Sequence, residues 1–424
     1  MALDLVKRTR WLAILAMLAG AAATGCVADS GRGDAEAVAT DDITQVSHTK
    51  VKRQSIGNCW IYATSSWLEA LDRAATGQEK DTSESWLTYW HWFEQLATGG
   101  TPTKISTGGT YGTAAALLSR YGVVLEGDFI AGDVEAEMSS RQSSALHAVE
   151  MWLESGPLKD AVARRDRRAI RAELDKAWEL EPAVIARIDA VFGEGVTRTL
   201  DRSPETAALA AANRIVTPKT FPVQLLDPET KQKVNVTLAD ALGTPAGFSR
   251  RAGKFAWNEL DYPRDATARR AFWKRVQRAL HDNQPVIASW KVDFNALDAR
   301  AVFSMDELRR RGPGRQGGHM TVMHDYQADV PGVGRLMAGV PATPEQMSAA
   351  LADGTVIQFV RVKNSWGGIR PDRWTDAAVP GYHDLDMFYL DGPIKECPED
   401  HGTDASLCTR DVTPLWDVVL PAGY

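Results

Sequence analysis

Residues 54–71 read Gln54-Ser-Ile-Gly57-Asn-Cys59-Trp-Ile-Tyr-Ala-Thr-Ser-Ser-Trp-Leu-Glu-Ala-Leu71, and the rest of the chain is organised around this stretch. A loop with a glycine leads directly into apolar residues at helical spacing, which predicts a helix that begins near Cys59. Unpaired backbone N–H groups and the positive end of the helix dipole favour an anion there. They favour thiolate over thiol and lower the pKa of a cysteine. We therefore interpret Cys59 as a catalytic thiolate.

The overall composition limits the classes of protein to consider. The chain has 424 residues and a globular composition, so two or three compact units are expected. Its net charge of -7 argues against non-specific nucleic-acid binding, which needs a basic surface. The 4 cysteines (Cys26, Cys59, Cys397 and Cys408) are too few for a disulfide scaffold. No cofactor and no metal ion are expected.

The first 26 residues have the pattern of an export signal. A positive region with Lys7, Arg8 and Arg10 precedes an apolar stretch and the small residues Ala23-Thr-Gly25. Cys26 follows directly, as in a bacterial lipobox, where the cysteine is lipidated and becomes the mature N-terminus. Ordinary secretion with an incidental cysteine is the alternative. Both interpretations place the protein outside the cytoplasm, in the cell envelope or secreted, with a lipid anchor as the only expected membrane contact.

The remaining chain divides by pattern into four segments. Residues 27–50 are rich in small and polar residues without an apolar period and predict a flexible tether. Residues 51–130 predict a helical lobe with the nucleophile, and 131–219 a helical insertion. The basic run 164–168 in this insertion suits a polyanion site or a salt-bridged helix surface, and interleaved acidic residues favour the surface. Residues 220–424 predict a β-rich lobe with strands at 221–226, 234–238, 285–292, 319–326, 356–363 and 387–390 and helices at 266–281 and 344–351.

Two residues of the β-rich segment suit the chemistry of Cys59. His319 follows Gln316-Gly-Gly and begins an apolar run that ends at Tyr326, so it lies at the mouth of a predicted strand. Taken alone, a structural histidine is the simpler interpretation. Asn364 ends another predicted strand in the motif Lys363-Asn-Ser-Trp366-Gly, and its side-chain oxygen can orient an imidazole. Trp366 is placed to shield that hydrogen bond from water.

One more residue, upstream of the cysteine, completes the candidate site. The side-chain amide of Gln54 can donate a hydrogen bond beside the backbone N–H of Cys59. Two such donors form an oxyanion hole.

Together these motifs resemble papain-like cysteine peptidases in their chain order: Gln54…Cys59-Trp, His319 before an apolar run, and Lys363-Asn-Ser-Trp-Gly. The resemblance implies a two-lobed α+β fold, in which a helical lobe carries the cysteine and an antiparallel, barrel-like β lobe carries the histidine and asparagine. It also implies Cys59 as nucleophile, His319 as base, Asn364 as its orienter and Gln54 as oxyanion donor. The aromatic helix 82–94 and the segment 108–123 are similar to the bleomycin hydrolase and aminopeptidase C branch.

Two departures from that family concern the loops around the groove. Gln54 lies five positions before Cys59, where the family usually has six, so the loop that carries the oxyanion donor is shortened. The segment between His319 and Asn364 is long, and its residues 331–354 are expected to form a flap over the groove.

The last two cysteines have two interpretations. Cys397 and Cys408 flank a short polar loop, and in an exported protein they are expected to form a disulfide. A metal site is the alternative, for which His401 is the only nearby imidazole.

The predicted function is hydrolysis of peptide bonds in peptide or protein substrates through a cysteine thioester. A transpeptidase or amidase that uses the same thioester is an alternative. A catalytically silent surface protein that binds peptides is another, and the three residues Cys59, His319 and Asn364 argue against it.

Overall fold

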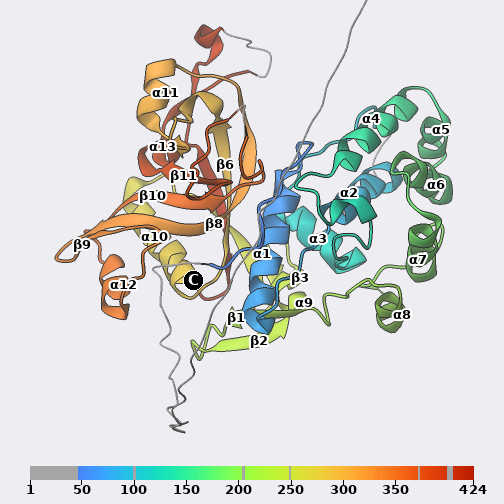
Figure 1. Ribbon diagram of the computed structural model, residues 1–424, viewed down its shortest axis with the longest axis horizontal. Coiled ribbons are helices and arrows are strands. Elements are labelled where there is room, and N and C mark those ends of the chain that lie inside the picture. Colours follow the sequence, from blue (N-terminus) through green and yellow to red (C-terminus); the bar gives the residue numbers. More distant parts are fainter. Residues whose placement is uncertain (1–45, 99–101, 203–205, 248–249, 371–372, 399–403) are drawn as a thin grey trace, which may run out of the picture. The chain divides into compact units, whose positions relative to one another are not determined.

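The computed structural model describes residues 46–424 apart from 99–101, 203–205, 248–249, 371–372 and 399–403 (Figure 1). The predicted signal peptide, the lipidation site Cys26 and most of the predicted tether lie outside the described residues, as does His401. Helices dominate the first half of the described chain and an antiparallel sheet the second. The α+β prediction is therefore confirmed. Within the described part, no helix combines the length and apolarity needed to cross a membrane.

Helix α1 (Cys59–Thr76) is the central element of the helical half. It contacts α2 and α3 on one side and strands β1 and β8 on the other, so most of its surface is buried. Gly77, with φ of 69°, ends the helix in the left-handed conformation that favours glycine. The other elements of this half are α2 (Glu84–Thr98), α3 (Tyr111–Tyr121), η1 (Ala131–Asp133), α4 (Ser140–Glu154), α5 (Pro157–Ala163), α6 (Arg167–Ala177), α7 (Pro182–Phe192) and α8 (Thr206–Ala212).

One sheet organises the second half, in the strand order β5-β14-β6-β8-β10-β11-β7, with β9 paired to β8. All its pairings are antiparallel except that of β11 with β7. The sheet is open, with β5 and β7 at its edges. Its strands are β5 (Trp257–Asp261), β6 (Val286–Asp293), β7 (Val302–Phe303), β8 (Gln316–Val330), β9 (Gly334–Leu336), β10 (Val356–Lys363), β11 (Tyr382–Asp386) and β14 (Leu415–Pro421).

Further helices and two short strand pairs complete this half of the chain. They are α10 (Ala266–His281), η2 (Phe294–Ala296), α11 (Met305–Arg311), α12 (Pro344–Ala350), α13 (Met387–Asp391) and η3 (Ala405–Leu407), with the small strand pairs β3 (Thr244–Pro245) and β4 (Arg251–Ala252), and β12 (Ile394–Glu396) and β13 (Arg410–Val412).

The sheet is buried on both faces, which brings the two halves together. Successive side chains of a strand point to opposite faces. Accordingly Ile287 of β6 packs into the core around α1, whereas its neighbours Val286 and Ala288 pack into a second core beneath the sheet. In β8, Met320 joins the α1 core. The backbone amide of Met320 reaches the thiol of Cys59, so the start of α1 lies against the part of β8 that carries His319.

The hairpin of β1 (Pro222–Leu226) and β2 (Lys233–Thr237) does not join this sheet. Together with α9 (Leu238–Leu242) it packs on the helical side, and Val223 and Leu225 are buried in the same core as α1. The strand pattern of 220–242 thus belongs to the helical half of the molecule, although it reads as part of the β-rich segment.

The described chain begins with a packed segment. Val46 is buried, its carbonyl accepts a hydrogen bond from His324, and Lys363 donates to Thr49, which in turn donates to Glu69. The flexible tether predicted over 27–50 is wrong for residues 46–50. Two of these partners, His324 and Lys363, lie on β8 and β10, far away in sequence, so local composition does not reveal them.

Two further expectations are wrong. Residues 387–390, predicted as a strand, belong to α13, where Asp386 caps the helix start by accepting from the backbone of Phe388. Residues 331–354 form no flap over the site. Their strand β9 pairs with Ala328–Val330 at the far end of β8 from His319 (Figure 1). At about 3.3 Å per residue that is roughly 30 Å along the strand.

Candidate active site

Cys59 is the first residue of α1, and the loop before it is firmly held. The side-chain amide of Asn58 donates to Thr88 of α2 and to Gln142 of α4, both over 2.9 Å. These bonds attach the turn before the helix to two neighbouring helices. The direction in which α1 presents the Cys59 thiol is therefore fixed by packing.

The neighbouring loop approaches this helix closely. A Cβ added at Gly109 would lie 2.5 Å from the indole of Trp60, whose Nε1 donates to the carbonyl of Thr107. Only glycine permits this approach. It explains the second glycine of the 108–123 segment, Gly109.

The charge state of Cys59 differs from the expectation. Burial raises the pKa of its thiol to about 11, although the backbone amides of Met320, Trp60 and Cys59 itself favour the thiolate. The predicted lowering of the pKa is wrong for this structure, because desolvation of the anion outweighs the helix start.

His319 is enclosed by two tryptophans. The ring of Trp366 stacks on the imidazole with 4.8 Å between centroids and 22° between planes, and Trp290 meets it edge-on at 5.5 Å. Trp290 and His319 are directly paired across β6 and β8. The ring is thus held in one orientation, and Trp366 covers it as the motif suggested.

Asn364 directly follows β10 and binds the imidazole. Nε2 of His319 donates to Oδ1 of Asn364 over 2.8 Å, and the backbone N–H of Ser365 donates to the same oxygen over 2.7 Å. On its other side, Nδ2 of Asn364 donates to Nδ1 of His383 over 3.3 Å. Because Nε2 carries the proton of the neutral imidazole, Nδ1 of His319 is left as the basic nitrogen.

Burial also determines the charge of His319. It lowers the pKa of the imidazole to about 4, the positive charge of Arg373 acts in the same direction, and the bond to Asn364 acts against both. In this structure His319 is therefore a neutral imidazole at pH 7, and Cys59 a neutral thiol.

The exposed fraction of the three side chains falls from Cys59 to His319 to Asn364. Cys59 keeps 9% of its surface exposed, His319 5% and Asn364 2%. The thiol lies at the backbone amide of Met320, the residue after His319. Within the described chain no hydrogen bond joins the thiol to the imidazole. Hydrogen bonds of catalytic groups are often long without substrate and tighten when it binds.

Gln54 lies beside the site and is held by its own loop. Its Oε1 accepts from the hydroxyl of Ser365 over 2.6 Å, and its Nε2 donates to the carbonyl of Ile56 over 2.7 Å. An amide nitrogen has two hydrogens. The second one has no acceptor among the described residues, so Gln54 retains one donor for a ligand.

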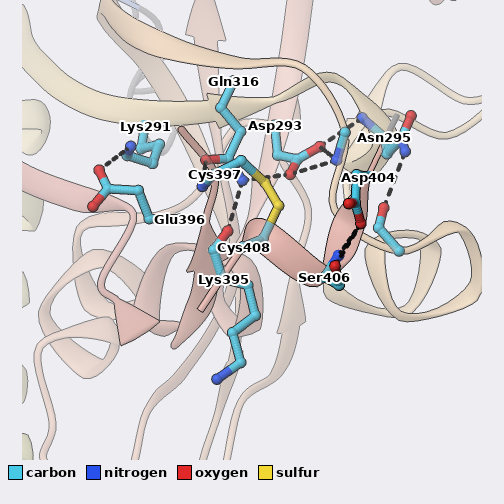
Figure 2. The surroundings of a disulfide bond; sticks show 12 residues. Lys291, Asp293, Asn295, Gln316, Lys395, Glu396, Cys397, Asp404, Ser406 and Cys408 are labelled. Carbon is cyan, nitrogen blue, oxygen red and sulfur yellow. Dashed lines mark hydrogen bonds and ion pairs between the residues drawn. A yellow bond between two sulfur atoms is a disulfide. The ribbon is translucent and has the colours of Figure 1, made fainter. Parts of the chain in front are cut away.

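Cys397 and Cys408 form a disulfide, 11 positions apart in sequence (Figure 2). Gln316, at the start of β8, accepts from the backbone N–H of Cys397 and donates to the carbonyl of Lys395 and to Asp293. The disulfide loop is thereby attached to the strand that carries His319. Cys59 is the free cysteine of the described chain.

The motifs do not single out one polar residue of the site. His383 is buried and faces Asn364. His383 of β11 pairs with Val362 of β10, which lies two residues before Asn364. A histidine in a strand that pairs next to a functional residue is the available signal, but the pairing register is needed to use it.

No family model matches the chain, and no curated protein matches it in sequence. Among solved structures, PepW from Lactobacillus rhamnosis HN001 is similar over 89% of this chain and 81% of its own, with 13% identity and a TM-score of 0.42. Xylellain, a cysteine protease from Xylella fastidiosa, is similar over 88% and 84%, with 11% identity and a TM-score of 0.33. Function is therefore inferred from the site of this chain.

Proposed function

We propose that the protein is a papain-like cysteine peptidase related to the bleomycin hydrolase and aminopeptidase C branch. The observation that carries the proposal is the buried 2.8 Å hydrogen bond between His319 and Asn364, next to a free cysteine at a helix start. A structural histidine needs neither the cysteine nor the aromatic cover. A base for acyl transfer needs both a nucleophile and a fixed tautomer.

The chemistry follows from the charge states. Nδ1 of His319 accepts the thiol proton as the sulfur of Cys59 attacks the carbonyl carbon of the scissile amide. The backbone N–H of Cys59 and the second Nε2 hydrogen of Gln54 stabilise the resulting oxyanion. The imidazolium then gives its proton to the leaving amine, which breaks the C–N bond and leaves a thioester. Water, deprotonated by the same imidazole, hydrolyses the thioester and restores the thiol.

Asn364 acts on this cycle through the imidazole. Its oxygen accepts from Nε2 when His319 is neutral and stabilises the same N–H when the ring is positive. Trp366 excludes water from that bond, which strengthens it in a low-dielectric environment.

Two substitutions test the proposal. Cys59→Ala abolishes peptide hydrolysis and labelling by an epoxide that alkylates active-site thiols, and Cys59→Ser keeps nearly the same volume but hydrolyses far more slowly. Unchanged near-ultraviolet circular dichroism shows that both variants are folded. Full hydrolysis by folded Cys59→Ala would refute the assignment.

The transpeptidase alternative shares every step up to the thioester and differs only in the acceptor. Adding a primary amine during hydrolysis separates the two. A peptidase releases mainly the free acid at low amine concentration, whereas a transpeptidase forms the new amide.

Export and lipidation at Cys26 belong to the same proposal and rest on the pattern of residues 1–26. The full chain expressed in a bacterium is expected to lose residues 1–25 and to gain lipid mass at Cys26. Cys26→Ser is expected to abolish the lipid mass. Recovery of the unprocessed chain from the cytoplasm would contradict the localisation.

A further inference from the structure

An open, arginine-rich cavity of about 630 Å³ lies beside the candidate site. Three segments line it. They are η2 with the residue after it, the end of α11 with the residue before β8, and residues that follow Trp366. The lining residues are Phe294, Leu297, Arg311, Arg315, Arg370, Arg373, Trp374 and Thr375. Four guanidinium groups and no carboxylate are among them.

The ring of Trp366 lies between the cavity and the imidazole of His319. Arg373 lies 4.4 Å from the centroid of Trp366, on whose ring His319 stacks. Phe294 stacks against Trp366 at 5.5 Å. Arg315 and Arg373 in turn lie 4.5 Å and 4.9 Å from the ring of Phe294. Arg373 also acts on His319 electrically, since its charge helps to lower the pKa of the imidazole.

Two of these arginines have no ion-pair partner within the described chain. On the same short helix, Arg309 pairs with Asp306, and Arg310 pairs with Glu307. Arg311 and Arg315 are exposed and form no ion pair within the described chain, although Glu307 is close enough to Arg311 for that charge to help lower the pKa of its carboxyl. Concentrating unneutralised cations in one cavity is unfavourable in the absence of an anion. Guanidinium groups bind carboxylates through paired hydrogen bonds.

The position of the cavity identifies the part of the substrate that enters it. The imidazole gives its proton to the leaving amine, so it lies next to the residues that follow the scissile bond. A cavity on the Trp366 side of His319 therefore receives the leaving-group side of the peptide.

We propose that this cavity is a leaving-group subsite that binds a carboxylate, with Arg311 and Arg315 as its main ligands. The carboxylate belongs to an acidic side chain after the scissile bond or to a free C-terminus of the substrate. This inference rests on the proposed peptidase function and names the substrates that the site prefers.

Cleavage of matched peptides tests the preference. Amidated peptides share the residues before the scissile bond and carry Glu, Gln or Lys in the two positions after it, and a fourth peptide has neutral residues and a free C-terminus. The amidated Glu peptide is expected to be cleaved with a kcat/KM about 10- to 100-fold above that of the Gln peptide, the range of a charge-assisted hydrogen bond. A gain for the free acid alone assigns the cavity to the C-terminus instead.

Variants connect the preference to the cavity. The double substitution Arg311→Gln and Arg315→Gln is expected to bring the Glu-to-Gln ratio close to one. Arg309→Gln is the matched control, because this arginine lies on the same helix, pairs with Asp306 and does not line the cavity. It is expected to keep the wild-type ratio.

A binding measurement separates this inference from the peptidase proposal. Calorimetry on the full protein with its thiol alkylated compares acetyl-Glu-Glu-amide with acetyl-Gln-Gln-amide and needs no turnover. Arginine-dependent binding of the acidic peptide without cleavage of any peptide supports the cavity and refutes the peptidase. Cleavage without any acidic or free-acid preference, together with equal binding of both dipeptides, refutes the cavity and leaves the peptidase standing.

Discussion

Asn364 donates a hydrogen bond to Nδ1 of His383, on the opposite side of its amide from His319. An asparagine amide can rotate to exchange its oxygen and nitrogen, and only one orientation offers an acceptor to His319. Burial lowers the pKa of His383 to about 3, so the ring is neutral and can accept. We therefore infer that His383, together with the backbone N–H of Ser365, keeps the oxygen of Asn364 facing the imidazole.

Replacing His383 tests this role. His383→Ala leaves Nδ2 of Asn364 without its acceptor, and we expect kcat to fall about tenfold, the value of one buried hydrogen bond, with KM little changed. His383→Gln restores an acceptor and is expected to recover part of the loss. A purely structural role predicts instead equal losses in both variants, in parallel with their free energies of unfolding.

Gln54 is expected to contribute through its free amide hydrogen. Gln54→Ala removes the donor and should lower kcat by about 10²–10³, as for other oxyanion-hole donors. Ser365→Ala removes only the partner of Oε1 and keeps the donor, so its loss should be much smaller. Steady-state kinetics on both variants make the comparison, and equal losses would show that Gln54 serves only to hold the loop.

The charge states predict how the thiol reacts with pH. Since burial raises the pKa of Cys59 to about 11 and lowers that of His319 to about 4, the resting pair is neutral between these values. The rate of alkylation by iodoacetamide should therefore rise steadily from pH 6 to pH 10. A rate that is constant from pH 5 to pH 8 would instead demonstrate a thiolate–imidazolium pair in the resting enzyme.

A buried charge cluster near the site predicts a pH dependence of stability. Lys52 forms ion pairs with Glu84 and Glu126, and burial raises the pKa of both carboxyls above the usual value, although the charge of Lys52 acts against this shift. Between the unfolded value near 4.5 and these raised values the folded state binds more protons than the unfolded state. Their contribution to the free energy of unfolding therefore falls as the pH rises through this window.

Glu126→Gln isolates one of these groups from the buried histidines, which titrate in the opposite sense. We expect the free energy of unfolding of the variant, minus that of the wild type, to rise between pH 5 and pH 8 by on the order of 1–3 kcal/mol. Urea unfolding of both proteins at several pH values measures the difference. A difference that does not change with pH would contradict the raised pKa of Glu126.

Periodicity predicted the elements whose burial pattern is local. The helix 266–281 and the strand 356–363 agree with α10 and β10 at both ends. The helix that begins at Cys59 was predicted from its apolar residues and the glycine loop before it. These elements bury a regular face, so their own sequence contains the signal.

Other features depend on contacts between distant segments. The packing of Val46 and Thr49 requires β8 and β10. At Met387 the apolar pattern suits a strand, but the cap by Asp386 starts a helix there. The position of β9 follows from the unusual length of β8, which extends to Val330, beyond the predicted end at Tyr326. None of these can be derived from the composition of the segment itself.

The candidate site shows the same division. Motifs placed Cys59 at a helix start, His319 in a strand and Asn364 directly after another, and the structure has them there. The sequence could not supply the burial that reverses the expected pKa of Cys59, nor the bond of Gln54 to Ile56. Both depend on how closely the neighbouring elements pack, which residue order alone does not determine.

The central claim is that Cys59 forms a thioester with the acyl part of a peptide. Rapid acid quenching during turnover of a cleavable peptide or its activated ester, followed by mass spectrometry of the digested protein, tests it directly. We predict that the acyl mass appears on the fragment that contains Cys59 and persists longer in Gln54→Ala. Turnover with no acyl adduct on Cys59 at any quench time, together with an active Cys59→Ala variant, would contradict the account.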